Sequence, residues 1–148
     1  MSEMKLLLLV HAAVTWMLVG LILTIQIVHY PLFRFVGAAS YPAYQDAHMG
    51  TITALVAPLM LIELVTAVIL ALAPPEGVPS WATWVGLALV GLIWFATLFI
   101  NSPQHAALSG GFDAATHAAL VASNWIRTIA WIGRGGLMLW LLARLIAR

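Results

Sequence analysis

The sequence predicts an all-α integral membrane protein, a bundle of four transmembrane helices. Of its 148 residues, 64% are hydrophobic and 7% are charged, whereas soluble domains carry about a quarter charged residues. Four apolar runs follow one another, each long enough to cross a hydrocarbon core of about 30 Å as a helix. The runs do not alternate between apolar and polar residues, which excludes a membrane β-barrel. We expect residues 1–148 to form a single membrane domain.

The four spans are expected at residues 6–28, 51–73, 81–100 and 125–147. The first contains no charged residue and is too long for the apolar core of a signal peptide. The third follows a breaker run at residues 74–79. An even number of spans places both termini on one side of the membrane, and positive charge predicts that side to be cytoplasmic. Lys5, Arg144 and Arg148 lie there, against Arg34 and Arg127 on the other side.

Charge and cysteine content exclude several classes of function. The net charge is +1, so no basic surface exists for nucleic acid and we expect no nucleic-acid partner. The chain has no cysteine, which excludes disulfides, thiolate metal sites and iron–sulfur clusters. Any metal would have to bind His, Asp, Glu or amide groups.

The two halves of the chain resemble each other when the second is shifted by 76 positions. His29 then falls on His105 and His48 on Asn124, and both pairs follow an odd-numbered span. Self-similarity of this kind predicts two helical-hairpin repeats. The polar residues of both repeats would then meet at the end of the bundle away from the termini.

Two charged residues are expected to pair inside the membrane. Glu63 lies about 18 Å from the start of the second span, and Arg134 lies only about 4.5 Å from that depth in the fourth span. Because an unpaired charge is costly in hydrocarbon, both should face the bundle and bind each other. The pair either holds two helices together or takes part in function.

His29, His48 and His105 form the candidate metal-binding set, with iron or copper as the possible metals. Imidazole also suits acid–base work, and the alternative is that each histidine is only hydrogen-bonded at the membrane interface. Asp46 is positioned to orient His48. His11 lies too far along the first span to join them, so a neighbouring helix should satisfy it; an axial haem ligand, from His11 or His48, is the less favoured alternative. Two further residues are expected on the solvated surface: Asp113 and His117.

The fourth span has one polar face. Arg127 and Arg134 are seven residues apart and share that face, and Asn124 lies one turn earlier. The alternatives are that Arg127 extends to the headgroups and that Asn124 only caps the helix. The tryptophans are expected to anchor span ends. Close helix packing is expected at three glycines: Gly133, Gly135 and Gly136.

Two segments carry a family resemblance: Asn101-Ser102-Pro103-Gln104-His105 and Asn124-Trp125-Ile126-Arg127-Thr128. They resemble the anthrone-oxygenase-like family of small four-helix membrane proteins, in which a polar-Pro-x-polar segment follows the third helix and a Trp/Asn-x-x-Arg-Thr pattern opens the fourth. The first half of the chain agrees in topology only. The resemblance implies a membrane protein related to enzymes that oxygenate anthrones to anthraquinones, with His105, Asn124 and Arg127 as catalytic positions.

Three functions remain open from the sequence. The first is a membrane oxidoreductase or oxygenase acting on a lipophilic aromatic or quinone-like substrate, in which histidines bind a metal or move protons. The second is a non-enzymatic membrane subunit or small carrier, in which Glu63 and Arg134 line a polar path and homo-oligomerisation makes room for it. The third is a haem-binding membrane protein.

Overall fold

The computed structural model describes residues 3–147, and Arg148 of the charge comparison lies outside that range. The first span consists of α1 (Glu3–Thr24), η1 (Ile25–His29), α2 (Tyr30–Leu32) and η2 (Phe33–Phe35). The second is α3 (Tyr41–Leu72). The third consists of α4 (Ser80–Ala96), η3 (Thr97–Asn101) and α5 (Ser102–Leu108), and the fourth is α6 (Ala114–Ile146). All four are long and apolar enough to cross a membrane, which confirms the four-helix prediction.

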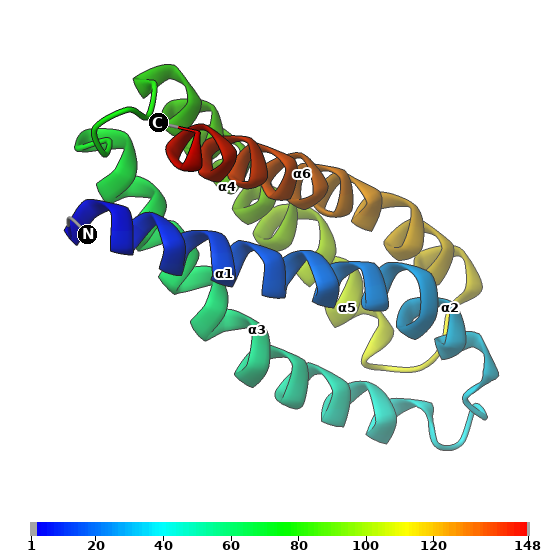
Figure 1. Cartoon of the computed structure of the whole chain (residues 1–148). Helices are drawn as coiled ribbons and strands as arrows, with labels where there is room; N and C mark the ends of the chain where they lie inside the picture. Colours follow the sequence, from blue (N-terminus) through cyan, green and yellow to red (C-terminus); the bar gives the residue numbers. More distant parts are fainter. Residues whose placement is uncertain (1–2, 148) are drawn as a thin grey trace.

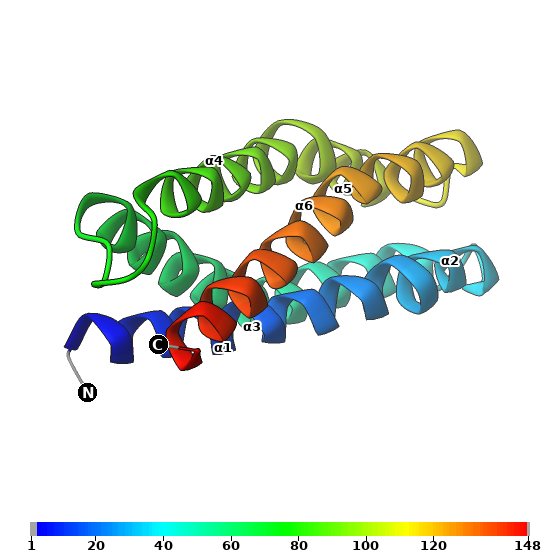
Figure 2. The ribbon, with the colours of Figure 1, turned by 45° about the horizontal axis from the view of Figure 1, so that its top comes forward.

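The helices form a four-sided bundle with both termini at the same end (Figure 1). α1 packs against α3 and α6, and α4 packs against the same two helices. α3 and α6 therefore stand on one diagonal and α1 and α4 on the other, an arrangement that can be followed in Figure 2. Side chains that reach from α3 to α6 must cross the centre of the bundle.

Two helices begin well before the predicted spans. α3 begins at Tyr41 and α6 at Ala114, where Asp113 caps the helix by accepting a hydrogen bond from the Thr116 backbone N–H at 2.7 Å. Hydropathy marks the part of a helix that lies in lipid, but helical hydrogen bonding continues into the polar zone beyond it. His48 therefore lies inside a helix although it precedes the predicted span, and the capping role considered for Asn124 is wrong because Asn124 also lies inside a helix.

The first and third spans share a local distortion. Each passes into a π-helical turn, in which the Tyr30 N–H bonds the Ile25 carbonyl and the Ser102 N–H bonds the Thr97 carbonyl. A proline follows each turn, and proline lacks the N–H that an α-helical bond would need. Pro31 and Pro103 are 72 positions apart, so this shared feature is offset from the register of 76, and the hairpin repeat stays a prediction.

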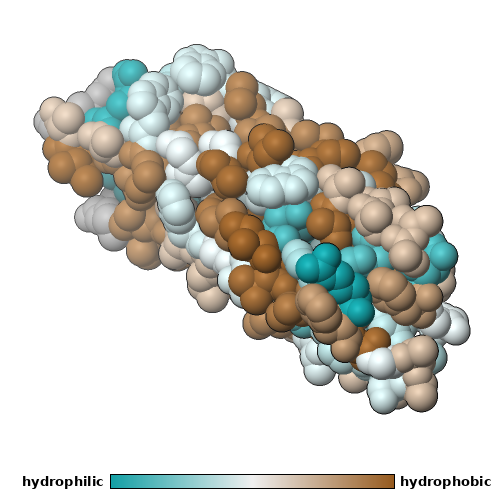
Figure 3. All heavy atoms as spheres, turned by 90° about the vertical axis from the view of Figure 1, so that its right-hand side faces the viewer, coloured by the Kyte–Doolittle hydropathy of each residue, from teal (hydrophilic) through white to brown (hydrophobic). Residues whose placement is uncertain are grey.

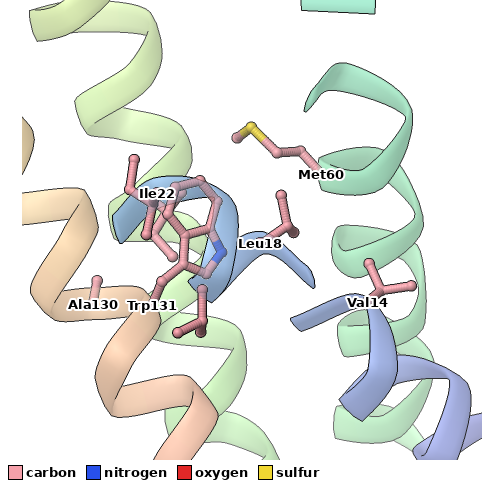
Figure 4. Packing of buried hydrophobic residues seen from close by; sticks show 8 residues of the cluster. Val14, Leu18, Ile22, Met60, Ala130 and Trp131 are labelled. Carbon is pink, nitrogen blue, oxygen red and sulfur yellow. The ribbon is translucent and has the colours of Figure 1, made fainter. Parts of the chain in front are cut away.

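Three apolar clusters fill the bundle along its length. In the middle one, Trp131 of α6 packs among residues of α1 and α3, as Figure 4 shows. A membrane-anchoring role is therefore wrong for Trp131, which is 1% exposed. The expected close packing is confirmed at Gly135, where an added Cβ would lie 3.2 Å from Trp16 and Val19, whereas Gly136 faces open space.

Large apolar side chains also cover the outside of the bundle, as in Phe99 and Leu72. Figure 3 shows apolar residues spread along the face that it views, with a compact group of hydrophilic residues among them. An exposed apolar surface of this extent is expected for helices that contact lipid. It supports the assignment as a multi-pass integral membrane protein, and the cytoplasmic location of the termini stays a prediction.

Candidate functional site

A cavity of about 230 Å³ lies between α3 and the third span, in the half of the bundle away from the termini. Its walls are mostly apolar. Polar groups gather at the end nearer the loops, where Tyr30, Asn101, His105 and Arg127 line it. Thr53 and Leu98 also line it and are exposed on the outer surface. The cavity therefore opens on a lipid-facing side of the bundle.

The polar end of the cavity lies close to a membrane boundary. The rings of Trp81 and Trp140 pack 5.5 Å apart near the termini, where paired aromatic residues mark an interface. Asn101 lies 20 residues after Trp81, which a helical rise converts to about 30 Å, the thickness of the hydrocarbon core. Asn101 and its neighbours are therefore placed at the opposite interface.

His105 lies at the centre of a buried hydrogen-bond chain. Its Nδ1 lies 3.0 Å from Gln45 Nε2, and its Nε2 lies 2.8 Å from the Tyr30 hydroxyl. Gln45 Nε2 also donates to the His105 carbonyl, which identifies this atom as the amide nitrogen. His105 Nδ1 must then accept and Nε2–H must donate to the Tyr30 oxygen. The Tyr30 O–H hydrogen is left available to the cavity.

Arg127 reaches the same end of the cavity from α6. It is 6% exposed, so the predicted alternative that it extends to the headgroups is wrong. Its Nη1 donates to Asn101 Oδ1 at 3.5 Å, and its guanidinium lies 5.5 Å from the centre of the Trp131 ring. Within residues 3–147 its Nε has no hydrogen-bond partner.

Asn124, the third catalytic position implied by the family resemblance, does not line the cavity. Its Nδ2 donates to Gln26 Oε1 at 2.7 Å, and Gln26 Nε2 donates to the Val121 carbonyl. Thr128 also donates to Gln26 Oε1. These bonds hold α6 against the end of the first span, so Asn124 stabilises the helices around the cavity without lining it.

The structure brings His29, His48 and His105 together but does not arrange them around a common point. His29 Nε2 and His48 Nδ1 lie 3.0 Å apart, and the rings of His48 and His105 are 5.4 Å apart. A metal needs a free nitrogen from each ring, yet both nitrogens of His105 are engaged. Among the described residues no group of three or more His, Asp or Glu is placed to hold a metal ion. The histidine metal site stays a prediction that this geometry does not favour.

A second cavity of about 400 Å³ lies beside His29 and His48. His29, Tyr44, His48 and Thr51 line it. Within the described chain, His48 Nε2 has no hydrogen-bond partner. Asp46, which was expected to orient His48, is exposed and lines neither cavity.

The expected pair of Glu63 and Arg134 is present, and it crosses the centre of the bundle. Arg134 Nε lies 2.9 Å from Glu63 Oε1, and both side chains are buried. Glu63 also accepts from Thr15 and from Trp131 Nε1. Arg134 donates further to the Gly86 carbonyl. Every donor and acceptor of the pair has a partner, which is typical of a structural ion pair.

His11 belongs to this central cluster, and neighbouring helices satisfy it as the sequence predicts. Its Nε2 accepts from Arg134 Nη2 at 2.9 Å, because a guanidinium only donates. Nδ1–H then donates to Thr66 Oγ1, which in turn donates to the Ile62 carbonyl. The cavity beside His11 holds about 10 Å³. His11 therefore has neither a free nitrogen nor the space that a haem ligand would need. The same small volume leaves no room here for a polar path beside the ion pair.

Three residues of the site were not anticipated as functional. Tyr30 and Gln45 hold His105, and His117 Nε2 donates to the Tyr30 carbonyl at 2.8 Å. His117 is buried, so its expected surface position is wrong. The sequence signal for Tyr30 is its place next to Pro31, because a residue before a distorting proline leaves the regular face of the helix. Gln45 and His117 lie outside the apolar runs, where sequence gives no indication of burial.

Comparisons with protein-family models, with curated proteins and with solved structures found no match to this chain. The resemblance to the anthrone-oxygenase-like family therefore stays a prediction from the two short segments that carry it.

Proposed function

We propose that the protein is a membrane oxidoreductase of the oxygenase type, acting on a lipophilic aromatic or quinone-like molecule held in the cavity between α3 and the third span. One observation carries the proposal. The cavity is apolar and opens toward lipid, but it ends on a cation and on the hydroxyl of a hydrogen-bonded Tyr–His–Gln chain. A substrate dissolved in the bilayer would enter sideways, with its oxygen at this polar end.

The reaction converts a methylene group between aromatic rings into a carbonyl. Loss of one proton gives an enolate, which reacts with O₂; the balance is R₂CH₂ + O₂ → R₂C=O + H₂O. The carbon loses four electrons and O₂ accepts four. Two C–H bonds and the O–O bond break, while one C=O bond and two O–H bonds form. O₂ is the oxidant and is shared between the ketone and water.

The residues would act on the charge that develops on the substrate oxygen. Arg127 and the Tyr30 O–H stabilise the enolate oxygen in a site that excludes water, where such interactions are strongest. His105 donates to Tyr30 and thereby keeps its hydrogen directed at the substrate. Proton removal needs a base beside the substrate. His48, whose Nε2 has no partner within residues 3–147, lines the second cavity and not this one, so we assign it no role in that step.

The test is oxygen uptake by the protein in lipid nanodiscs supplied with a dihydroxyanthrone. The expected result is uptake above that of empty nanodiscs, with one anthraquinone formed per O₂ consumed. Arg127→Gln should lower kcat/KM by about 10²-fold, the usual effect of losing one oxyanion-stabilising group. His105→Ala should lower kcat/KM no more than Tyr30→Phe does while the protein stays folded, because His105 acts through the Tyr30 hydroxyl.

Thr97→Val is the matched control. Thr97 lines the same cavity, but its hydroxyl donates to the Ile93 carbonyl of its own helix. Its replacement keeps the shape of the wall and should leave turnover nearly unchanged. If the wild-type protein consumed oxygen no faster than empty nanodiscs, the proposal would be wrong. Equal losses of expression and activity in His105→Ala would make that residue structural.

A further inference from the structure

We infer that the cavity holds its ligand as an oxyanion, with Arg127 as the counter-ion. This inference rests on the proposed function, because it names the ionic form of the molecule held in the same cavity. The observation behind it is a difference between the two buried arginines in their carboxylate partners.

Arg127 and Arg134 lie on the same helix and are both buried, but only Arg134 is neutralised. Glu63 pairs with Arg134 at 2.9 Å. Among residues 3–147 no carboxylate pairs with Arg127, and the other four acidic residues of the chain are all exposed. The groups that contact Arg127 are uncharged: the amide oxygen of Asn101, the ring face of Trp131 and the phenol of Tyr30.

A buried guanidinium without a counter-ion is costly, and proteins usually supply a carboxylate. Here the nearest buried carboxylate is already engaged. Glu63 binds Arg134 through Oε1 and Trp131 through Oε2. Glu63 thus fixes the indole against which Arg127 lies, without reaching Arg127 itself. The guanidinium keeps its full charge and is held facing the cavity.

Hydrogen-bond donors also outnumber acceptors at the cavity. Two lining groups, Arg127 Nε and Trp94 Nε1, are buried and have no acceptor within the described part of the chain. The Tyr30 O–H is a third free donor, because the Tyr30 oxygen accepts from His105 Nε2–H and its own hydrogen is not used in that bond. Asn101 Oδ1 already faces Arg127. Buried donors normally have partners, so the missing partner is a ligand rich in acceptor oxygens.

The position of the cavity fits an amphiphilic anion. The cationic end lies at the membrane boundary, where the ionised head of an amphiphile resides, and the apolar wall at Val56, Met60 and Leu98 extends toward the membrane centre. Two sources share this chemistry: the phenolate or enolate of an aromatic molecule, and the carboxylate of a fatty acid. The following experiment distinguishes them.

Binding is measured by equilibrium dialysis against protein in zwitterionic nanodiscs, with partition into empty nanodiscs subtracted. The probes are lawsone, a hydroxynaphthoquinone that is ionised at neutral pH, its uncharged methyl ether, and decanoic acid. We expect lawsone to bind at least about tenfold more tightly than the ether. Arg127→Gln should remove this preference, and Arg127→Lys, which keeps the charge, should retain part of it.

Arg34→Gln is the matched control, because Arg34 lies at the same end of the bundle but is exposed. It should leave the preference unchanged, which separates a specific counter-ion from general surface attraction. Equal binding of lawsone and its ether by the wild-type protein would overturn the inference and leave the proposed function standing. Binding of decanoate alone would support the oxyanion site but contradict the aromatic substrate. No binding of any probe would overturn both.

Discussion

Breaking the central ion pair should destabilise the protein more than removing it altogether. Glu63→Gln keeps the size of the side chain but leaves Arg134 as a buried charge without a counter-ion. Breaking one partner of a buried pair costs 3–5 kcal/mol in soluble proteins. The unfolded helices remain in lipid, where polar groups also find partners, so we expect a loss of about 3 kcal/mol in the free energy of unfolding. Arg134→Met should cost a similar amount.

The double replacement, Glu63→Leu with Arg134→Met, removes both charges. Four groups then lose a partner: Thr15 Oγ1 and Trp131 Nε1, which donate to Glu63, and His11 Nε2 and the Gly86 carbonyl, which accept from Arg134. The Gly86 carbonyl lies inside α4 and keeps its helical hydrogen bond, and the Thr15 hydroxyl can donate to its own helix instead, so Trp131 and His11 are the two groups left without a partner. Each orphaned group costs about 1 kcal/mol or more. The double variant should therefore lose about 2–3 kcal/mol, no more than either single variant. Adding Trp131→Phe removes one orphaned donor, although it also removes part of the support for Arg127.

The assay is reversible unfolding in mixed micelles, followed by helical circular dichroism. Glu76→Gln serves as control, because Glu76 is exposed between α3 and α4, and it should change the free energy of unfolding by no more than about 0.5 kcal/mol. Additive losses, with the double variant as unstable as the sum of the single ones, would refute the reasoning. So would single losses no larger than that of the control.

Three further predictions follow from particular contacts. Gly135→Ala should lower the unfolding free energy by about 1–3 kcal/mol, because its Cβ would press on α1, whereas Gly136→Ala, in open space, should not. The hydrogen bond from Thr116 holds the pKa of Asp113 below its ordinary value of 3.8. Its contribution to stability is therefore present above pH 3.8 and lost as pH falls through the lowered pKa, and Asp113→Asn should abolish that part of the acid dependence of unfolding. Tyr30→Phe should lower kcat for anthrone oxidation without changing the melting temperature by more than a few degrees, which a thermal-shift measurement checks.

The sequence predicts most reliably what lipid constrains. Lipid excludes unpaired backbone and charge, so apolar runs indicate the helices, and depth along them brought Glu63 and Arg134 together. The same reasoning failed where the constraint ends. The helical turns that carry Gln45, His48 and His117 lie beyond the apolar runs, where polar residues are compatible with either a loop or a helix. Their burial depends on the packing of α3, α5 and α6 at that end of the bundle.

The site itself depends on distances that no local pattern records. Tyr30 reaches His105 across 75 positions of the sequence, and Gln45 reaches it across 60. The π-helical turn before Pro31 shifts the residues that follow it relative to a regular helix. A projection that assumes 3.6 residues per turn therefore misplaces Tyr30. Asn124 shows the converse: its polar type and position suggested chemistry, but its hydrogen bond to Gln26 gives it a structural role.

Arg127 and Arg134 show how little residue type decides on its own. Both occupy one face of α6, seven residues apart, and only their depth in the membrane lets the sequence assign Arg134, and not Arg127, to Glu63. Their difference arises from α3, where a carboxylate meets the deeper arginine and Met60, one turn closer to the loops, borders the cavity beside the other. A glutamate at that level would neutralise Arg127 and close the anion site. Met60→Glu should therefore abolish the preference for lawsone over its ether while leaving the Glu63–Arg134 pair intact, and an undiminished preference would show that Arg127 is not the counter-ion.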